Sequence, residues 1–191
     1  MSARMLVRVL VAAVLSIVSA APAVSAQEPV PEAAKSAMEP LAWLAGRWSG
    51  EGTYVGPEGT RKIEQTEEIR VALEGALLVV EGTGREPSRG GEPGVVVFRA
   101  FGVFSAGDEP GTYRFAAWQG GRFVDARAEL AEDGGLAWGF ETPDGGRIRY
   151  VMQRPEPDVW HEEGTFLAPG EETPRPFFEM RLHREPAGSA R

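Results

Sequence analysis

The sequence predicts an all-β protein, an antiparallel up-and-down barrel of about ten strands preceded by a short helix. Short runs alternate apolar and polar residues with a period of two, most clearly from Arg122 to Leu130. Glycine pairs and Asp-Gly dipeptides separate the runs, and no regular alternation of strands with helices is present. A closed barrel is the most economical arrangement because closure removes exposed strand edges, and a two-sheet sandwich is the alternative.

The first 26 residues have the order of a secretory signal peptide. Arg4 and Arg8 precede an apolar block at 9–18, and small residues follow up to Ala26. Serines interrupt the block, which is shorter than the roughly 20 residues of a membrane-spanning helix. We therefore expect cleavage after Ala26, a periplasmic or secreted protein, and no stable membrane anchor after cleavage.

The charge of the chain argues against nucleic-acid partners. Cleavage would remove Arg4 and Arg8 but no acid, and so change the net charge from -8 to -10. An acidic surface repels phosphate backbones, and no cluster of basic residues offers a local exception. The chain has no cysteine, so packing alone has to stabilise the fold.

The remainder divides into a flexible linker at 27–36, a barrel domain at 37–185 and a disordered tail at 186–191. Two prolines and no apolar period characterise the linker. Nearly helical spacing of Met38, Leu41 and Leu44 predicts a helix over 36–45.

Strands are predicted in ten runs, and a meander alternates their loops between two ends. The runs are 47–55, 62–73, 76–84, 94–105, 111–118, 122–130, 135–141, 147–153, 158–167 and 177–184. The long loops at 56–61, 85–94 and 168–176 then share one end, which we expect to be the mouth. The link at Glu74 and Gly75 shares the other end with the helix, which we expect to plug it.

Familiar catalytic and metal-binding patterns are missing. Neither the nucleophile elbow nor the dinucleotide-binding glycine pattern occurs. With two histidines and no cysteine, a site built from His161 with Glu162 or Glu163 would need further ligands. We therefore predict no metal site. Carboxylate catalysis stays open because the chain has 28 acids.

Two charged residues interrupt apolar strand faces. Arg99 alternates with valines and phenylalanines, and Glu162 does so with Trp160 and Phe166. If these faces point inward, each places a charge in the core, which costs several kcal/mol unless the charge is paired or meets a ligand. Arg99 would then pair with an acid such as Glu67, Glu81 or Glu162. An ordinary ion pair and a ligand-orienting group are both open.

Aromatic residues are the expected filling of a small barrel, but a pocket is also consistent with the pattern. Ala126 and Ala128 lie on the predicted dry face of their strand, and small side chains opposite large rings leave a cavity. The candidate ligand-binding residues are Trp48, Arg99, Trp118, Trp138, Tyr150, Trp160 and Glu162.

Several segments resemble a bacterial family of lipocalin-like domains of unknown function. The opening motif Leu-Ala-Trp-Leu-Ala-Gly-Arg-Trp-Ser-Gly-Glu-Gly at 41–52 is the most specific, and 149–150, 160–164 and 177–182 are similar to that family's last strands. The resemblance spans 40–184 and implies a calycin-type barrel without an agreed activity.

The opening motif also resembles, more distantly, that of the nitrobindin-like haem barrels. That resemblance implies a haem-ligating histidine on the last strand. The register places Glu179 at this position and His183 nearer the strand end, which disfavours haem.

Three functions follow as hypotheses. The first is a non-enzymatic exported barrel that holds a small, partly apolar molecule in its interior. The second is a hydrolase or isomerase that uses an interior carboxylate such as Glu162, which a raised carboxyl pKa in a cleft would favour. The third is a protein-interaction module with a solid barrel, which a filled interior and an exposed apolar patch would favour.

Overall fold

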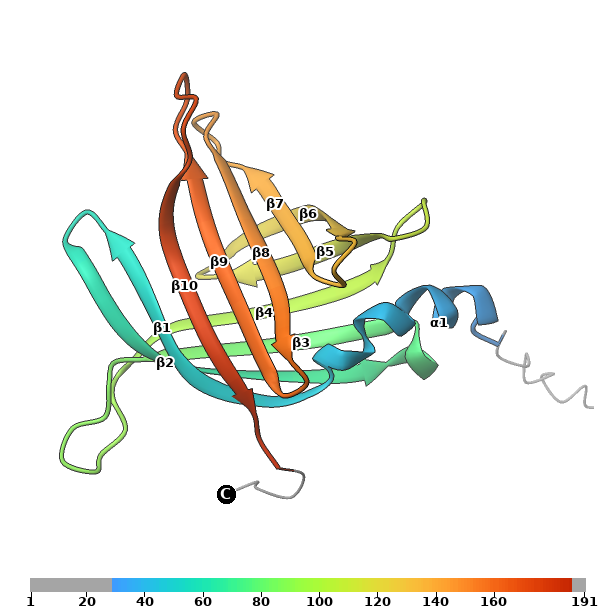
Figure 1. Cartoon of the computed structure of the whole chain (residues 1–191), viewed down its shortest axis with the longest axis horizontal. Helices are drawn as coiled ribbons and strands as arrows, with labels where there is room; N and C mark the ends of the chain where they lie inside the picture. The colour runs from blue at the N-terminus through green and yellow to red at the C-terminus, as the bar shows by residue number, and fades with distance from the viewer. Residues whose placement is uncertain (1–28, 187–191) are drawn as a thin grey trace, which may run out of the picture.

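Ten antiparallel strands close into one barrel in the computed structural model, which describes residues 29–186 (Figure 1). The strands are β1 (Gly46–Gly56), β2 (Gly59–Ala72), β3 (Leu77–Arg85), β4 (Val96–Ala106), β5 (Thr112–Gln119), β6 (Arg122–Leu130), β7 (Leu136–Glu141), β8 (Arg147–Glu156), β9 (Val159–Leu167) and β10 (Arg175–Arg184). Each strand pairs with the one before it, and β10 pairs with β1. The predicted up-and-down barrel is confirmed, and the sandwich is excluded.

The predicted strands agree with the observed ones to within three residues at every end. β6 begins and ends at the predicted residues, because its alternation is the clearest in the sequence. The predicted signal peptide at 1–26 and the tail from 187 onward lie outside the described residues.

The N-terminal helix differs from the prediction. It begins at Glu32 as α1 (Glu32–Met38) and continues as the 3-10 helix η1 (Glu39–Leu44), so half of the predicted linker is helical. Alanine, lysine and methionine have high helix propensity, which explains the earlier start. Pro40 has no backbone N–H to donate within an α-helix, and the chain tightens into η1 at this point.

These helices plug one end of the barrel, as predicted. Met38, Leu41 and Leu44 are buried in the core. The indole Nε1 of Trp48, the first buried residue of β1, donates a hydrogen bond of 2.8 Å to the Leu44 carbonyl oxygen. Figure 1 shows the helices beside the strand ends where β2 turns into β3. Within residues 29–186, no helix has the length and apolarity of a membrane span.

Arg184 fastens the end of β10 to this plug. Its guanidinium group donates hydrogen bonds of 2.5 Å to the Trp43 carbonyl and 2.6 Å to the Ala45 carbonyl. The same group lies over the Trp48 ring, 4.1 Å from the ring centroid. One side chain therefore connects the last strand, the first strand and the plug.

The other end of the barrel is the mouth, where the loops 57–58, 86–95, 120–121, 142–146 and 168–174 gather. Gly120 and Gly121 have φ angles of 55° and 79°, which the tight turn between β5 and β6 requires. Inward-facing side chains near this end are only half-buried, namely Phe98, Ala117, Val124, Phe140, Ile148, Phe166 and Phe178. Solvent therefore reaches the inner wall from the mouth.

Replacing Arg184 tests its connecting role. We expect Arg184→Met to lower the free energy of unfolding by about 2 kcal/mol, since two partly buried hydrogen bonds to carbonyls, a third to the exposed Asp158 and a cation-π contact are lost. Urea unfolding followed by tryptophan fluorescence measures the loss. Arg181→Met, on the exposed side of the same strand, is the control and should change stability by less than about 0.5 kcal/mol. Equal losses in the two variants would contradict the role.

Candidate functional site

Three polar side chains lie buried inside the barrel: Gln65, Glu67 and Glu162, each no more than 8% exposed. Gln65 and Glu67 are the inward-facing residues in the middle of β2. Glu162 faces inward from β9 between Trp160 and Gly164. Two carboxyl groups from opposite parts of the sequence therefore share the interior.

Glycines on β3 provide the space for the polar side chains of β2. Gly82 pairs with Glu67, and Gly84 pairs with Gln65. A Cβ atom at Gly82 would lie 2.7 Å from Glu67 Oε1, and one at Gly84 would lie 2.8 Å from Gln65 Oε1. Any larger residue at these two positions would displace the carboxyl or the amide.

The hydrogen bonds inside the barrel leave acceptors without donors. Gln65 Nε2 donates a hydrogen bond of 2.7 Å to Glu67 Oε1. Glu67 Oε2 and Gln65 Oε1 are buried and have no hydrogen-bond partner among the described residues. The indole Nε1 of Trp160 also lacks a well-aligned partner, although it lies close enough to Glu162 to affect that carboxyl. Buried polar atoms without partners are costly.

Burial raises the pKa of both carboxyl groups. The pKa of Glu67 rises to about 7, and the hydrogen bond from Gln65 offsets part of the rise. The pKa of Glu162 rises to about 8, through burial first and then through the negative charge of Glu67. The indole N–H groups of Trp138 and Trp160 lower the pKa of Glu162 and so offset part of this rise. No basic group among the described residues contributes to either shift.

An aromatic wall adjoins Glu162 on the side of the mouth. Trp138 and Tyr150 are stacked, with ring centroids 4.2 Å apart and planes 14° apart. Phe178 meets Tyr150 edge to face at 6.0 Å. Burial, followed by the negative charge of Glu162, raises the pKa of Tyr150, so its phenol stays neutral.

Three tryptophans close the other side. Trp43, Trp48 and Trp160 pack edge to face, with centroids between 5.9 and 6.3 Å apart. This cluster separates the carboxyl groups from the plugged end. The interior is therefore closed toward the plugged end.

Five of the seven predicted binding residues face the interior: Trp48, Trp138, Tyr150, Trp160 and Glu162. Their role in binding stays a prediction. The structure places the other two, Arg99 and Trp118, on the outer wall.

The prediction that Arg99 and Trp118 line the interior is wrong. Arg99 is exposed, and Trp118 is 45% exposed. The inward face of β4 contains Phe98, Ala100, Gly102 and Phe104, and its outward face also carries valines and Phe101, so both faces resemble a core face in the sequence. Glu67 was predicted only as a partner for Arg99, which it does not contact.

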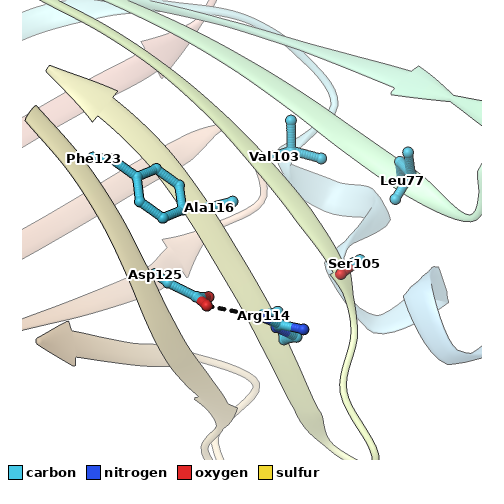
Figure 2. Close-up of a pocket in the computed structure, with 7 residues that line it drawn as sticks. All are labelled: Leu77, Val103, Ser105, Arg114, Ala116, Phe123 and Asp125. Atoms are coloured by element: carbon cyan, nitrogen blue, oxygen red, sulfur yellow. Dashed lines mark hydrogen bonds and ion pairs between the residues drawn. The ribbon is translucent and has the colours of Figure 1, made fainter. Parts of the chain in front are cut away.

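Outside the barrel, Trp118 forms an aromatic patch with Phe101 and Phe123. The Trp118 ring centroid lies 5.9 Å from that of Phe101 and 5.0 Å from that of Phe123. Beside this patch, an open hollow of about 210 Å³ lies on the outer wall of β3 to β6 (Figure 2). Its only close polar contact drawn in Figure 2 is the 2.7 Å ion pair between Arg114 and Asp125.

The sequence pattern did not identify Gln65 as a site residue, and it indicated Glu67 only as a possible ion-pair partner of Arg99. Both faces of β2 carry charged or polar side chains, so its sequence does not reveal which face is inward. The glycines at 82 and 84 were the available signal, since alternating glycines within a strand mark a close approach of another group.

Histidines contribute nothing to the interior. His161 and His183 lie on the outer faces of β9 and β10, whose inward residues include Met180 and Leu182. A haem iron inside the barrel would therefore have no imidazole ligand from the described residues, so the histidine-ligated haem that the nitrobindin resemblance implies does not fit.

One outward group could offer ligands to a metal ion. The ligand atoms of His161, Glu163 and Glu179 lie within 4.8 Å of one another, and His161 Nε2 lies 3.1 Å from Glu179 Oε1. Glu163 and Glu179 are exposed, and His161 already has a carboxylate partner. We assign no ion to this group.

Known structures contain the same barrel. The chain resembles the crystal structure of Rv2717c from M. tuberculosis with a TM-score of 0.64 and 14% identity, over 78% of this chain and 98% of that one. It also resembles the S-type phycobiliprotein lyase CPES from Guillardia theta with a TM-score of 0.55 and 10% identity, over 76% and 90% of the two chains. The fold is lipocalin-like.

These identities establish the fold alone. No family model and no curated protein matches the sequence. The calycin-type barrel implied by the opening motif is thus confirmed, whereas the bacterial family itself and the nitrobindin link have no further support.

The raised pKa values predict how stability depends on pH. Both carboxyl groups bind a proton more tightly in the folded chain than at the ordinary pKa of 4.5. The free energy of unfolding should therefore fall as the pH rises from about 4.5 to about 8, by up to roughly 1.4 kcal/mol per pH unit for each group. Urea unfolding at several pH values between 5 and 9 measures the slope.

Glu162→Gln should reduce this slope and stabilise the protein at pH 8.5. Glu163→Gln, one residue further along β9 and exposed, is the matched control and should leave the slope unchanged. A slope that is the same in wild type and Glu162→Gln would contradict the assignment.

Proposed function

We propose that this chain is an exported, lipocalin-like barrel that binds a small, partly apolar molecule in its interior. The observation that carries the proposal is the pair of buried carboxyl groups, Glu67 and Glu162, placed behind a half-exposed aromatic wall. An interior that served only packing would be more stable with apolar residues at these positions. A few polar groups placed among aromatic and apolar side chains are typical of small-molecule sites.

One of the similar structures supports the same reading at the level of fold. The protein from Guillardia theta is named a phycobiliprotein lyase, so a barrel of this kind has a function beyond packing in another protein. Its chemistry does not carry over to this chain at 10% identity.

Two neighbouring alanines on β5 make a matched test of where binding occurs. Ala117 faces the interior near the mouth, and Ala116 lines the outer hollow (Figure 2). We expect the neutral fluorescent probe N-phenyl-1-naphthylamine to bind wild type and Ala116→Trp equally well. Its affinity for Ala117→Trp should be at least tenfold lower, because the added indole occupies the barrel interior near the mouth. Fluorescence titration measures the affinities.

Native mass spectrometry of the same three proteins, purified from an exporting host, tests for a retained molecule. Wild type and Ala116→Trp should retain it, and Ala117→Trp should not. Loss of binding in Ala116→Trp alone would move the site to the outer hollow. Absence of both probe binding and a retained molecule in wild type would contradict the proposal.

Export is the second part of the proposal, based on the order of charged, apolar and small residues up to Ala26. Expression of the full chain in a bacterial host should yield a periplasmic or secreted protein whose N-terminus is Gln27. N-terminal sequencing and intact mass measure this. A cytoplasmic protein that still begins at Met1 would contradict it.

Acid–base catalysis at the same site is a second candidate function. The raised pKa of Glu162, to about 8, keeps a proton on this carboxyl at neutral pH, which is what a general acid requires. The mass of the molecule recovered from the protein, measured before and after prolonged incubation at 25 °C, decides between binding and turnover. An unchanged mass favours binding alone.

A further inference from the structure

Two buried hydrogen-bond acceptors of the interior lack a donor, and no basic side chain among the described residues acts on the carboxyl groups beside them. Glu67 Oε2 and Gln65 Oε1 are buried without a donor, and Glu162 is buried beside them. A carboxylate can accept several hydrogen bonds, whereas Gln65 Nε2 supplies Glu67 with one. What the site lacks is a group that donates several hydrogen bonds.

The groups around the two carboxyls come from several strands, and none of them is basic. Gln65 lies next to Glu67 along the inner face of β2, and Trp160 next to Glu162 on β9. Trp138 on β7 and Tyr150 on β8 approach Glu162 from the side of the mouth. The paired neighbours of Glu162 on β8 and β10 are methionines.

The nearest arginines at the plugged end lie beyond the tryptophan cluster. The guanidinium group of Arg184 lies over the Trp48 ring, and that of Arg154 lies 5.9 Å from the centroid of the Trp43 ring. Arg184 is already engaged with two backbone carbonyls. Neither arginine affects the pKa of Glu67 or Glu162, so neither serves as their counter-ion.

We propose that the molecule bound in the interior carries a protonated amine, whose ammonium group contacts Glu67 and Glu162 while its aromatic part packs against Trp138 and Tyr150. This inference rests on the proposed function and specifies the class of ligand. An ammonium group brings up to three N–H donors and a positive charge, which the acceptors of this site lack. Its contact with tryptophan and tyrosine faces is also favourable.

Other ligand charges fit the site less well. A carboxylate ligand would bring a negative charge beside Glu67 and Glu162, where no basic group among the described residues acts, and a buried charge without a partner is costly. A neutral apolar ligand would leave the unpaired acceptors without donors. A cation satisfies both the charge and the hydrogen bonds.

Binding of a cation should be coupled to the release of protons. Glu67 and Glu162 have pKa values of about 7 and about 8 without ligand, and a neighbouring ammonium group lowers both. Affinity for an amine should therefore rise with pH between about 5.5 and 8. The phenol of Tyr150 also faces Glu162, and burial raises its pKa, so it stays neutral in this range.

Three probes with the same ring and different charge test the inference: 2-(1-naphthyl)ethylamine, 2-(1-naphthyl)ethanol and 3-(1-naphthyl)propanoate. Isothermal titration calorimetry at pH 7.5 should give an affinity for the amine at least tenfold above that for the alcohol, and no binding of the carboxylate. Titrations in two buffers with different ionisation enthalpies should reveal proton release on amine binding at pH 6.5.

Glu162→Gln and Glu67→Gln should each reduce the preference for the amine over the alcohol at least fivefold, and reduce proton release. Both substitutions remove a buried charge, so folding is expected to be retained. Glu163→Gln is the matched control and should behave as wild type.

Equal affinities for amine and alcohol, or tighter binding of the carboxylate, would overturn the amine inference while leaving an interior binding site. Failure of all three probes, together with failure of N-phenyl-1-naphthylamine, would overturn the proposed function itself.

Discussion

Closure of the barrel at the seam between β1 and β10 is the constraint on which the rest of the structure depends. Arg184 holds this seam, because its guanidinium group bonds to the carbonyls of Trp43 and Ala45 and covers the ring of Trp48. The plug and the tryptophans beneath it exclude water from one end of the interior. Without that exclusion the carboxyl groups would be solvated, and neither pKa would be raised.

Two acids in such an interior are costly to the fold. Glu67 and Glu162 are buried, and no basic group among the described residues acts on either. Burial makes both carboxyl groups costly to ionise, and the negative charge of Glu67 adds to the cost for Glu162. Gly82 and Gly84 increase the cost further, since glycine weakens a strand interior and here makes room for polar groups. Such a combination of unfavourable choices on adjacent strands is typical of a functional site, where local stability is given up for chemistry.

The sequence predicted the barrel well because strand length, turn glycines and alternation all agree on it, as β6 demonstrates. It predicted the interior less well, because a shift of one residue along a strand moves every side chain from the inner to the outer face. On β4 and β5 both faces carry large apolar side chains: Phe104 and Phe115 lie inside, whereas Phe101 and Trp118 lie outside. On β2 both faces are polar, so only the paired strand reveals that Gln65 and Glu67 point inward. Hydrophobicity alone could not predict these positions.

The fold itself leaves the ligand undecided, because barrels of this kind serve different chemistries in proteins with little sequence in common. What distinguishes one interior from another is its set of polar groups. An interior with an inward imidazole can bind a metal-containing cofactor, and an interior with inward cations can bind an acid. In the described part of this chain the buried polar residues of the interior are two carboxyls and an amide, with aromatic rings on the open side. That set complements a positive charge attached to an aromatic body, and it does so without any contribution from the exposed loops.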